Sequence, residues 1–161
     1  MTIGAVPTLF LICGLPGAGK TTLARRLAAE LPAVRFSPDE WLADLGLDLF
    51  DVPLRGRLER RFTTLAMELL DHGQDVILDF GFWTRAERDE PRDEARRRGA
   101  RVELHYLTAP LEELARRIVA RSQEPGGVQL DPALLAEYAP LFEVPTADEL
   151  RGYGNGDGRL H

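Results

Sequence analysis

The sequence contains few of the residues that form disulfides or transition-metal sites. One cysteine stands among 161 residues, at Cys13 after an apolar run, so an internal disulfide is excluded and core packing is the expected role of this thiol. The three histidines, His72, His105 and His161, have no metal-ligand spacing. Disulfide scaffolds and zinc sites built from cysteine and histidine are therefore excluded.

Long apolar runs are also missing. No segment approaches the roughly 20 apolar residues of a membrane-spanning helix, and residues 1–7 lack the basic region and apolar core of a secretory signal. These absences predict a cytoplasmic protein without a membrane partner. The length fits one domain, which we place at residues 1–150, followed by a glycine-rich flexible tail at residues 151–161.

Positive charge is not in excess, which weighs against an extended nucleic-acid surface. The net charge is −6, and such surfaces bind mainly by neutralising phosphates. Arginines do gather between Arg85 and Arg101, but acidic residues are interleaved with them. This pattern is typical of a solvated helix face with ion pairs.

Lysine occurs only once, and its position is the strongest functional signal in the chain. The other 19 of the 20 basic residues are arginines. Lys20 stands in the segment 14–21, Gly-Leu-Pro-Gly-Ala-Gly-Lys-Thr, which matches the phosphate-binding pattern G-x-x-x-x-G-K-[ST]. A compact ammonium in a chain that otherwise uses arginine indicates a site with a specific need for lysine.

Each residue type in this segment suits a polyphosphate. The glycines allow successive N–H groups to turn inward around an anion. Lys20 is expected to reach the β- and γ-phosphates, Thr21 to coordinate Mg²⁺, and the helix that begins there to add its positive end. The predicted nucleotide-binding residues are Gly14, Leu15, Pro16, Gly17, Ala18, Gly19, Lys20, Thr21 and Thr22.

The flanking sequence has the strand, loop and helix context that this motif requires. Residues 8–13 are nearly all apolar, as in a strand buried on both faces of a parallel sheet. After the loop, apolar residues recur at helical spacing from Leu23 to Leu31. Further strands are predicted at residues 34–36, 76–78 and 102–107.

Helices are predicted between the strands, the longest over residues 54–71. Two of them begin with the residue spacing of a capping box. In this motif the hydroxyl of the N-cap residue accepts a hydrogen bond from the backbone amide three residues later, and the acidic side chain at that later position accepts one from the N-cap amide. These boxes pair Ser37 with Glu40 and Thr84 with Glu87.

Strands that alternate with helices predict an α/β fold with a parallel sheet and right-handed crossovers. Ligands of such sheets gather beyond the carboxyl ends of the strands. The expected architecture is a P-loop NTPase three-layer α/β/α sandwich, nucleoside-kinase-like, with a parallel sheet of four or five strands. No convincing fifth strand follows Phe142.

Two acidic residues follow predicted strands at the edge where the phosphate loop lies. Asp79 could complete the Mg²⁺ shell, or it could cap the turn from strand to helix. Asp39 could act as the general base that accepts the proton of an acceptor hydroxyl. Its alternative role is to complement the dipole of the helix that begins at Pro38.

A later predicted helix carries arginines before a glycine-containing loop. Arg117 and Arg121 are one turn apart, on the face opposite the apolar stripe, and a lid helix of this kind would stabilise charge on a transferring phosphoryl group. Arg116 is an adjacent candidate, and an exposed arginine face is the alternative. Four aromatic residues either line an acceptor pocket or pack in the core, namely Trp41, Phe80, Phe82 and Trp83.

The order of these features resembles the small P-loop kinases related to chloramphenicol phosphotransferase, zeta toxin and the kinase domain of polynucleotide kinases. The likeness spans most of the chain but is specific only at the loop, and the other positions match by order and context. It implies ATP and Mg²⁺ as cofactors, held by Lys20 and Thr21, and Asp39 as the general base. It also implies that Arg117 and Arg121 belong to a lid.

The predicted function is an ATP- and Mg²⁺-dependent kinase that moves the γ-phosphate to a hydroxyl of a small molecule. Its catalytic residues would be Lys20, Asp39, Arg117 and Arg121, with Thr21 and Asp79 at the metal. A 5′-hydroxyl polynucleotide kinase is one alternative, and a nucleotide-dependent switch with slow ATP hydrolysis is another. The residues do not identify the acceptor, and the preference for ATP comes from the resemblance.

Overall fold

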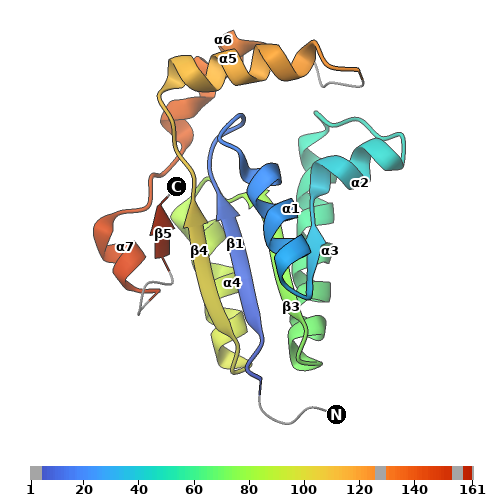
Figure 1. Ribbon diagram of the computed structural model, residues 1–161, viewed down its shortest axis with the longest axis vertical. Coiled ribbons are helices and arrows are strands. Elements are labelled where there is room, and N and C mark those ends of the chain that lie inside the picture. The colour runs from blue at the N-terminus through green and yellow to red at the C-terminus, as the bar shows by residue number, and fades with distance from the viewer. Residues whose placement is uncertain (1–4, 126–129, 154–157, 161) are drawn as a thin grey trace.

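Five parallel strands form the sheet at the centre of the structure (Figure 1). Their order across the sheet is β2-β3-β1-β4-β5. This computed structural model describes residues 5–125, 130–153 and 158–160. The strands are β1 at Thr8–Cys13, β2 at Ala33–Phe36, β3 at Asp75–Gly81, β4 at Arg101–Tyr106 and β5 at Gly158–Leu160. The predicted α/β architecture is confirmed.

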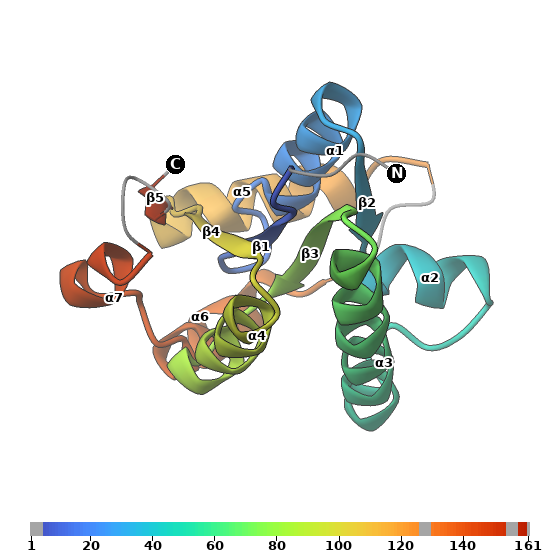
Figure 2. The ribbon, with the colours of Figure 1, turned by 90° about the horizontal axis from the view of Figure 1, so that it is seen from below.

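Helices cover both faces of this sheet, which makes three layers (Figure 2). On one face lies α1 at Lys20–Glu30, and on the other lie α3 at Val52–Asp71 and α4 at Arg85–Arg97. Side chains alternate between the two faces of β1, so Leu9 and Leu11 join the core under α3 and α4, while Phe10 and Ile12 join the core under α1. Both sets are buried, which explains why this strand is apolar throughout.

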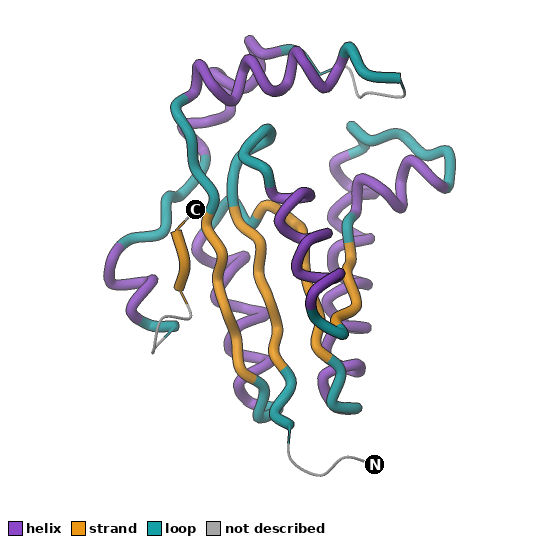
Figure 3. Tube along the Cα trace, in the orientation of Figure 1, coloured by secondary structure: helices purple, strands orange, loops and turns teal. Residues whose placement is uncertain are grey.

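The remaining helices lie mostly at the carboxyl ends of the strands. Figure 1 shows α5, at Leu111–Ser122, crossing the top of the sheet above the loop that follows β1, with α6, at Pro132–Tyr138, beside it. A short 3₁₀ turn follows at Ala139–Leu141. Figure 3 shows that loops connect the elements at this edge, where α2, at Pro38–Asp44, also begins. The topology therefore brings the predicted site residues to one edge.

The capping predictions have different outcomes. The box at the start of α4 is confirmed, because Thr84 accepts from the Glu87 amide and the Glu87 carboxylate accepts from the Thr84 amide. The prediction of a capping box at the start of α2 is wrong. Ser37 is the N-cap residue, but its side chain makes no capping hydrogen bond. The Glu40 carboxylate instead accepts from Arg25 and Arg35, at 2.5 and 2.7 Å. Two arginines on neighbouring elements outcompete the backbone for this carboxylate.

The C-terminal segment is more ordered than the sequence indicated. The sequence left open whether the sheet has four or five strands, and the structure has five, because Gly158–Leu160 pairs in parallel with β4. A short helix, α7 at Ala147–Arg151, precedes it, and Tyr153 is buried. Of these, Tyr153 and Gly158–Leu160 belong to the predicted tail, whose residues 154–157 and 161 lie outside the described residues. The three residues of this strand, Gly-Arg-Leu, include one large apolar side chain, which is too short a pattern to read as a strand.

The arginine-rich helix α4 is largely the predicted solvated face with ion pairs. Arg97 and Arg98 pair with Glu94 within the helix. Arg88 is the exception, because it is fully buried and pairs with Glu149 of α7. Within the described residues, no helix is long and apolar enough to cross a membrane.

Candidate active site

The loop after β1 adopts a glycine-dependent conformation close to α5. Gly17 has a φ of 85°, and a Cβ at this position would lie 3.0 Å from the Leu114 carbonyl oxygen. At the start of the loop, a Cβ on Gly14 would lie 2.6 Å from the Leu107 carbonyl oxygen, and the Gly14 amide donates to the Gly81 carbonyl at 3.0 Å. The glycines therefore allow the loop to lie close to two neighbouring backbones.

Lys20 is the first residue of α1 and turns back over the loop. Its ammonium donates to the Leu15 carbonyl at 3.0 Å. Burial lowers the pKa of this ammonium below its ordinary value, and the negative charges of Asp79 and Asp39 partly oppose that shift. Lys20 therefore contacts the backbone of the loop, and two of the predicted acidic site residues act on its charge.

Thr21 and Asp79, the two predicted metal ligands, contact each other. The Thr21 hydroxyl donates to Asp79 Oδ2 at 3.0 Å, and the Asp79 side chain is buried. Burial raises the pKa of Asp79 above its ordinary value, while Lys20 and the Thr21 hydrogen bond pull it down. Asp79 lies inside β3 rather than after its end, which corrects the predicted strand boundary.

The same pair fits a Mg²⁺ ion that also binds a nucleotide. Mg²⁺ prefers oxygen ligands and is commonly held by one or two protein groups together with substrate phosphates and water. Among the described residues, no group of three or more histidine, cysteine, aspartate or glutamate side chains could hold a metal by itself. The donor set therefore suits a cation that arrives with its nucleotide.

Arg117 and Arg121 of α5 face the loop across a cavity of about 520 Å³. This cavity is also lined by Gly17, Gly19 and Thr22. Arg117 donates to the Gly17 carbonyl at 3.2 Å and to Glu113 at 3.1 Å. The structure therefore brings together both predicted lid arginines and the phosphate-binding segment.

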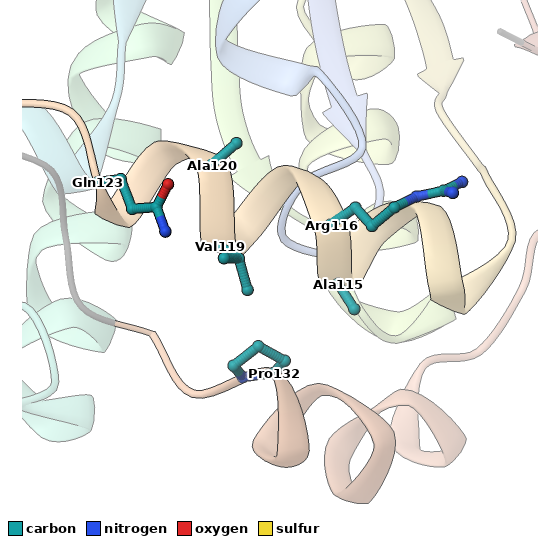
Figure 4. A pocket seen from close by; sticks show the side chains of 6 residues that line it. All are labelled: Ala115, Arg116, Val119, Ala120, Gln123 and Pro132. Atoms are coloured by element: carbon teal, nitrogen blue, oxygen red, sulfur yellow. The ribbon is translucent and has the colours of Figure 1, made fainter.

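Arg116 lies outside this cavity. It pairs with Glu113 and lines a separate cavity of about 340 Å³ between α5 and α6 (Figure 4). Figure 4 shows Ala115 and Val119 pointing toward Pro132 at the start of α6. Among the described residues, Arg116 makes no contact with the phosphate loop. It is therefore less well placed than Arg117 for the predicted lid role.

Asp39 lies at the start of α2 with an exposed carboxylate, whose side chain is 62% accessible. Arg55 of α3 donates to this carboxylate through Nη1 and contacts Glu59 one turn further along α3, with 3.3 Å between Nε and Oε1. Burial raises the pKa of Glu59 to about 7; Arg55 opposes this shift, and Glu87 and Asp39 add to it. Arg55 thus lies between two carboxyl groups, and Asp39, Arg55 and Glu59 are called here the acidic–arginine row.

The four aromatic residues differ in burial and in their packing partners. Phe62 packs against Trp41 with 5.0 Å between ring centroids, and against Phe80 with 6.2 Å. Phe82 is buried in the core, whereas Trp41 is 44% exposed beside the acidic–arginine row. Trp83 packs against Phe142. Phe82 is therefore part of the core, and Trp41 is the most exposed of the four.

Arg55 and Glu59 were not identified from the sequence. Both belong to a helix whose apolar spacing was clear, and their charges looked like the ordinary solvated face of that helix. The signal available was the spacing of four residues between an arginine and a glutamate. That spacing predicts an ion pair, but it does not show that Asp39 lies beside it.

Comparisons with known proteins identify the family of the chain. The family described as AAA domain matches residues 9–145. A cytidylate kinase from Ignicoccus hospitalis is 34% identical over 137 residues, covering 79% of this chain and 70% of that protein. A shikimate kinase from Chromohalobacter salexigens is 32% identical over 152 residues, covering 89% of this chain and 81% of that protein.

A solved structure supports the fold independently. Kti12 from Chaetomium thermophilum, in complex with ADP-AlF3, has a TM-score of 0.70 with 18% identity, covering 95% of this chain and 88% of that one. At this identity the likeness shows the fold alone. Taken with the family match and the two kinase relatives, it confirms the predicted resemblance: the chain belongs to the AAA domain family and is a P-loop kinase-like protein.

Proposed function

We propose that this protein transfers the γ-phosphate of ATP to a hydroxyl group of a small molecule, with Asp39 as the general base. The kinase relatives support the phosphotransferase class. The observation that carries the acceptor half is the exposed Asp39 carboxylate at the start of α2, which Arg55 of α3 contacts. A carboxylate at this place suits proton removal.

The charges around Asp39 favour a hydroxyl acceptor over a phosphate acceptor. The cytidylate kinase and the shikimate kinase act on different acceptors, so the family alone does not decide between them. A phosphate acceptor needs positive charge and no base, whereas a hydroxyl must lose its proton. The acidic–arginine row contains one arginine and two carboxyl groups, which suits a hydroxyl acceptor.

The nucleotide side would act by position and charge. Lys20 would bind the β- and γ-phosphates, and the backbone of the loop from Gly14 to Gly19 would surround them. Thr21 and Asp79 would hold Mg²⁺, which when bound neutralises charge on the phosphates. Such transfers need little covalent chemistry from the protein, so this arrangement would supply much of the rate.

The transfer itself would proceed in line. The acceptor oxygen forms a bond to the γ-phosphorus as the bond to the β,γ-bridging oxygen breaks, ADP leaves, and the hydroxyl proton passes to Asp39. Arg117 and Arg121, on the far side of the phosphate loop, would stabilise the charge on the transferring group.

The test is transfer from γ-labelled ATP with Mg²⁺ to a panel of antibiotics, nucleosides, sugars and 5′-hydroxyl oligonucleotides. Label on a small-molecule hydroxyl that is absent with Lys20→Ala is the expected result. Label on the oligonucleotides, with a steep dependence on salt, would instead favour a polynucleotide kinase. Label released only as free phosphate would favour a nucleotide-dependent switch.

A further inference from the structure

A buried ion pair joins α4 to α7 on the side of the sheet away from α1. Arg88 Nε and Nη2 donate to the two carboxylate oxygens of Glu149 at 2.8 and 2.9 Å. Arg88 is 0% exposed and Glu149 is 2% exposed. Two charges are thus removed from water at a place that the proposed reaction does not use.

The third contact of this guanidinium reaches the turn after β3. Arg88 Nη1 donates to the Phe82 carbonyl at 2.8 Å. Phe82 has a φ of 51°, and no other non-glycine residue among those described has a positive φ. An aromatic residue in this conformation is strained and needs neighbours that hold it there.

The same turn supports the phosphate loop. Gly81 accepts from the Gly14 amide at 3.0 Å, and the Phe82 carbonyl also accepts from the Cys13 thiol at 3.4 Å. Asp79 lies two residues before Gly81 on the same strand. The position of the Gly81–Phe82 turn therefore affects both the start of the phosphate loop and the carboxylate beside Thr21.

Further contacts connect the turn to the C-terminal segment. The Glu143 amide donates to the Trp83 carbonyl at 2.7 Å, and the Glu143 carboxylate accepts from the Arg85 amide at 2.7 Å. Thr146 caps α7 and so fixes the helix that carries Glu149. The turn is thus held from α4 and from α7 together.

Stability alone is a weak explanation for this pair. Removing two charges from water is costly, and apolar residues of similar volume often replace a buried ion pair without loss of stability. Apolar residues, however, could not donate to the Phe82 carbonyl. The hydrogen bond to the turn is the property that this arginine adds.

We propose that Arg88 is a positioning residue for nucleotide binding. Glu149 orients its guanidinium, the guanidinium holds the Phe82 carbonyl, and the Gly81–Phe82 turn in turn holds the start of the phosphate loop. Helix α7, which ends where the predicted tail begins, is therefore part of the framework of the nucleotide site.

The test compares nucleotide affinity with thermal stability in the full-length chain. The double variant Arg88→Met/Glu149→Leu replaces the ion pair with apolar side chains of similar size. We expect its dissociation constant for mant-ATP with Mg²⁺ to rise about tenfold, which is the effect of losing one hydrogen bond from a charged donor. We expect its Tm to stay within a few degrees of the wild-type Tm. Arg92→Met is the matched control, because Arg92 also lies on α4 and against Tyr153 but has no contact with the turn.

Two further variants keep the outcomes distinct. Arg88→Lys retains a charge but cannot hold both Glu149 oxygens and the Phe82 carbonyl, so it should also weaken nucleotide binding. Unchanged affinity in a folded double variant would overturn the proposal, as would equal weakening in Arg92→Met or a loss of folding in both Arg88 variants. If the wild type bound mant-ATP no better than Lys20→Ala, the proposed function would fail instead.

Discussion

The nucleotide side and the acceptor side of the site differ in how the chain forms them. The nucleotide side comes mainly from the consecutive residues 14–22, with a buried Asp79 added from β3. The acceptor side combines Asp39 of α2 with Arg55 and Glu59 of α3, and the Asp39 side chain is 62% accessible. One side is specified locally, and the other depends on how two helices pack.

This difference separates two kinds of information in the sequence. A loop that surrounds phosphates needs glycines, a lysine and a hydroxyl in fixed order, because backbone groups do most of the binding. An acceptor site needs side chains that converge in space, and their order in the chain is unconstrained. We therefore expect substitutions on the two sides to separate nucleotide binding from transfer.

The largest expected effect is that of Lys20→Ala. Loss of the ammonium should reduce transfer on the order of 10³-fold and also weaken nucleotide binding, because the same charge contacts the phosphates in both states. Steady-state transfer rates and mant-ATP titrations measure the two effects. Arg25→Ala is the control, since Arg25 lies on the same helix and pairs only with Glu40 among the contacts described. Normal transfer by Lys20→Ala would break the assignment of the nucleotide side.

A smaller effect is expected for Arg117→Ala. Arg117 lines the cavity beside the loop and donates to Gly17, so its loss should lower kcat by roughly 10- to 100-fold with little change in acceptor KM. Arg116→Ala is closely matched, because Arg116 shares the Glu113 partner but faces the other cavity. Equal effects of the two substitutions on kcat would contradict the lid role.

The smallest expected effect concerns pH and the acceptor side. Native Glu59 keeps its proton up to about pH 7, whereas the unfolded chain loses it near the ordinary pKa of 4.5. The native state then binds more protons between these values, so this group makes the free energy of unfolding fall as pH rises from about 4.5 to 7.

Glu59→Gln should remove that contribution to the slope. Urea unfolding at several values of pH between 4.5 and 8 measures it. Glu68→Gln, at an exposed position of the same helix, should keep the wild-type slope. An unchanged slope in Glu59→Gln would show that Glu59 titrates normally and would weaken the description of the acidic–arginine row.

Sequence reasoning reached the nucleotide side because local physics decides it. The apolar strand at residues 8–13, the glycines and Lys20 each have a local cause, and the strand, loop and helix they predict are confirmed. The roles of Asp39, Arg117 and Arg121 remain predictions, although the structure places the two arginines beside the loop.

The errors came from long-range contacts. Glu40 was expected to cap α2, but it pairs with arginines from α1 and β2. Arg88 looked like one more solvated arginine until Glu149, 61 residues away, accounted for its burial. The short β5 depends on pairing with β4 rather than on its own sequence. Apart from Arg35, which is five residues from Glu40, these partners are distant in the chain, so composition and periodicity could not indicate them.

The most direct test of the account measures transfer and nucleotide affinity together in Asp39→Asn. The account predicts that transfer to the acceptor found in the panel falls on the order of 10² to 10⁴-fold, because the hydroxyl loses its base, while the dissociation constant for MgATP stays near the wild-type value. A folded Asp39→Asn protein with wild-type transfer would contradict the role of Asp39. A parallel loss of MgATP affinity would contradict the separation of the two sides.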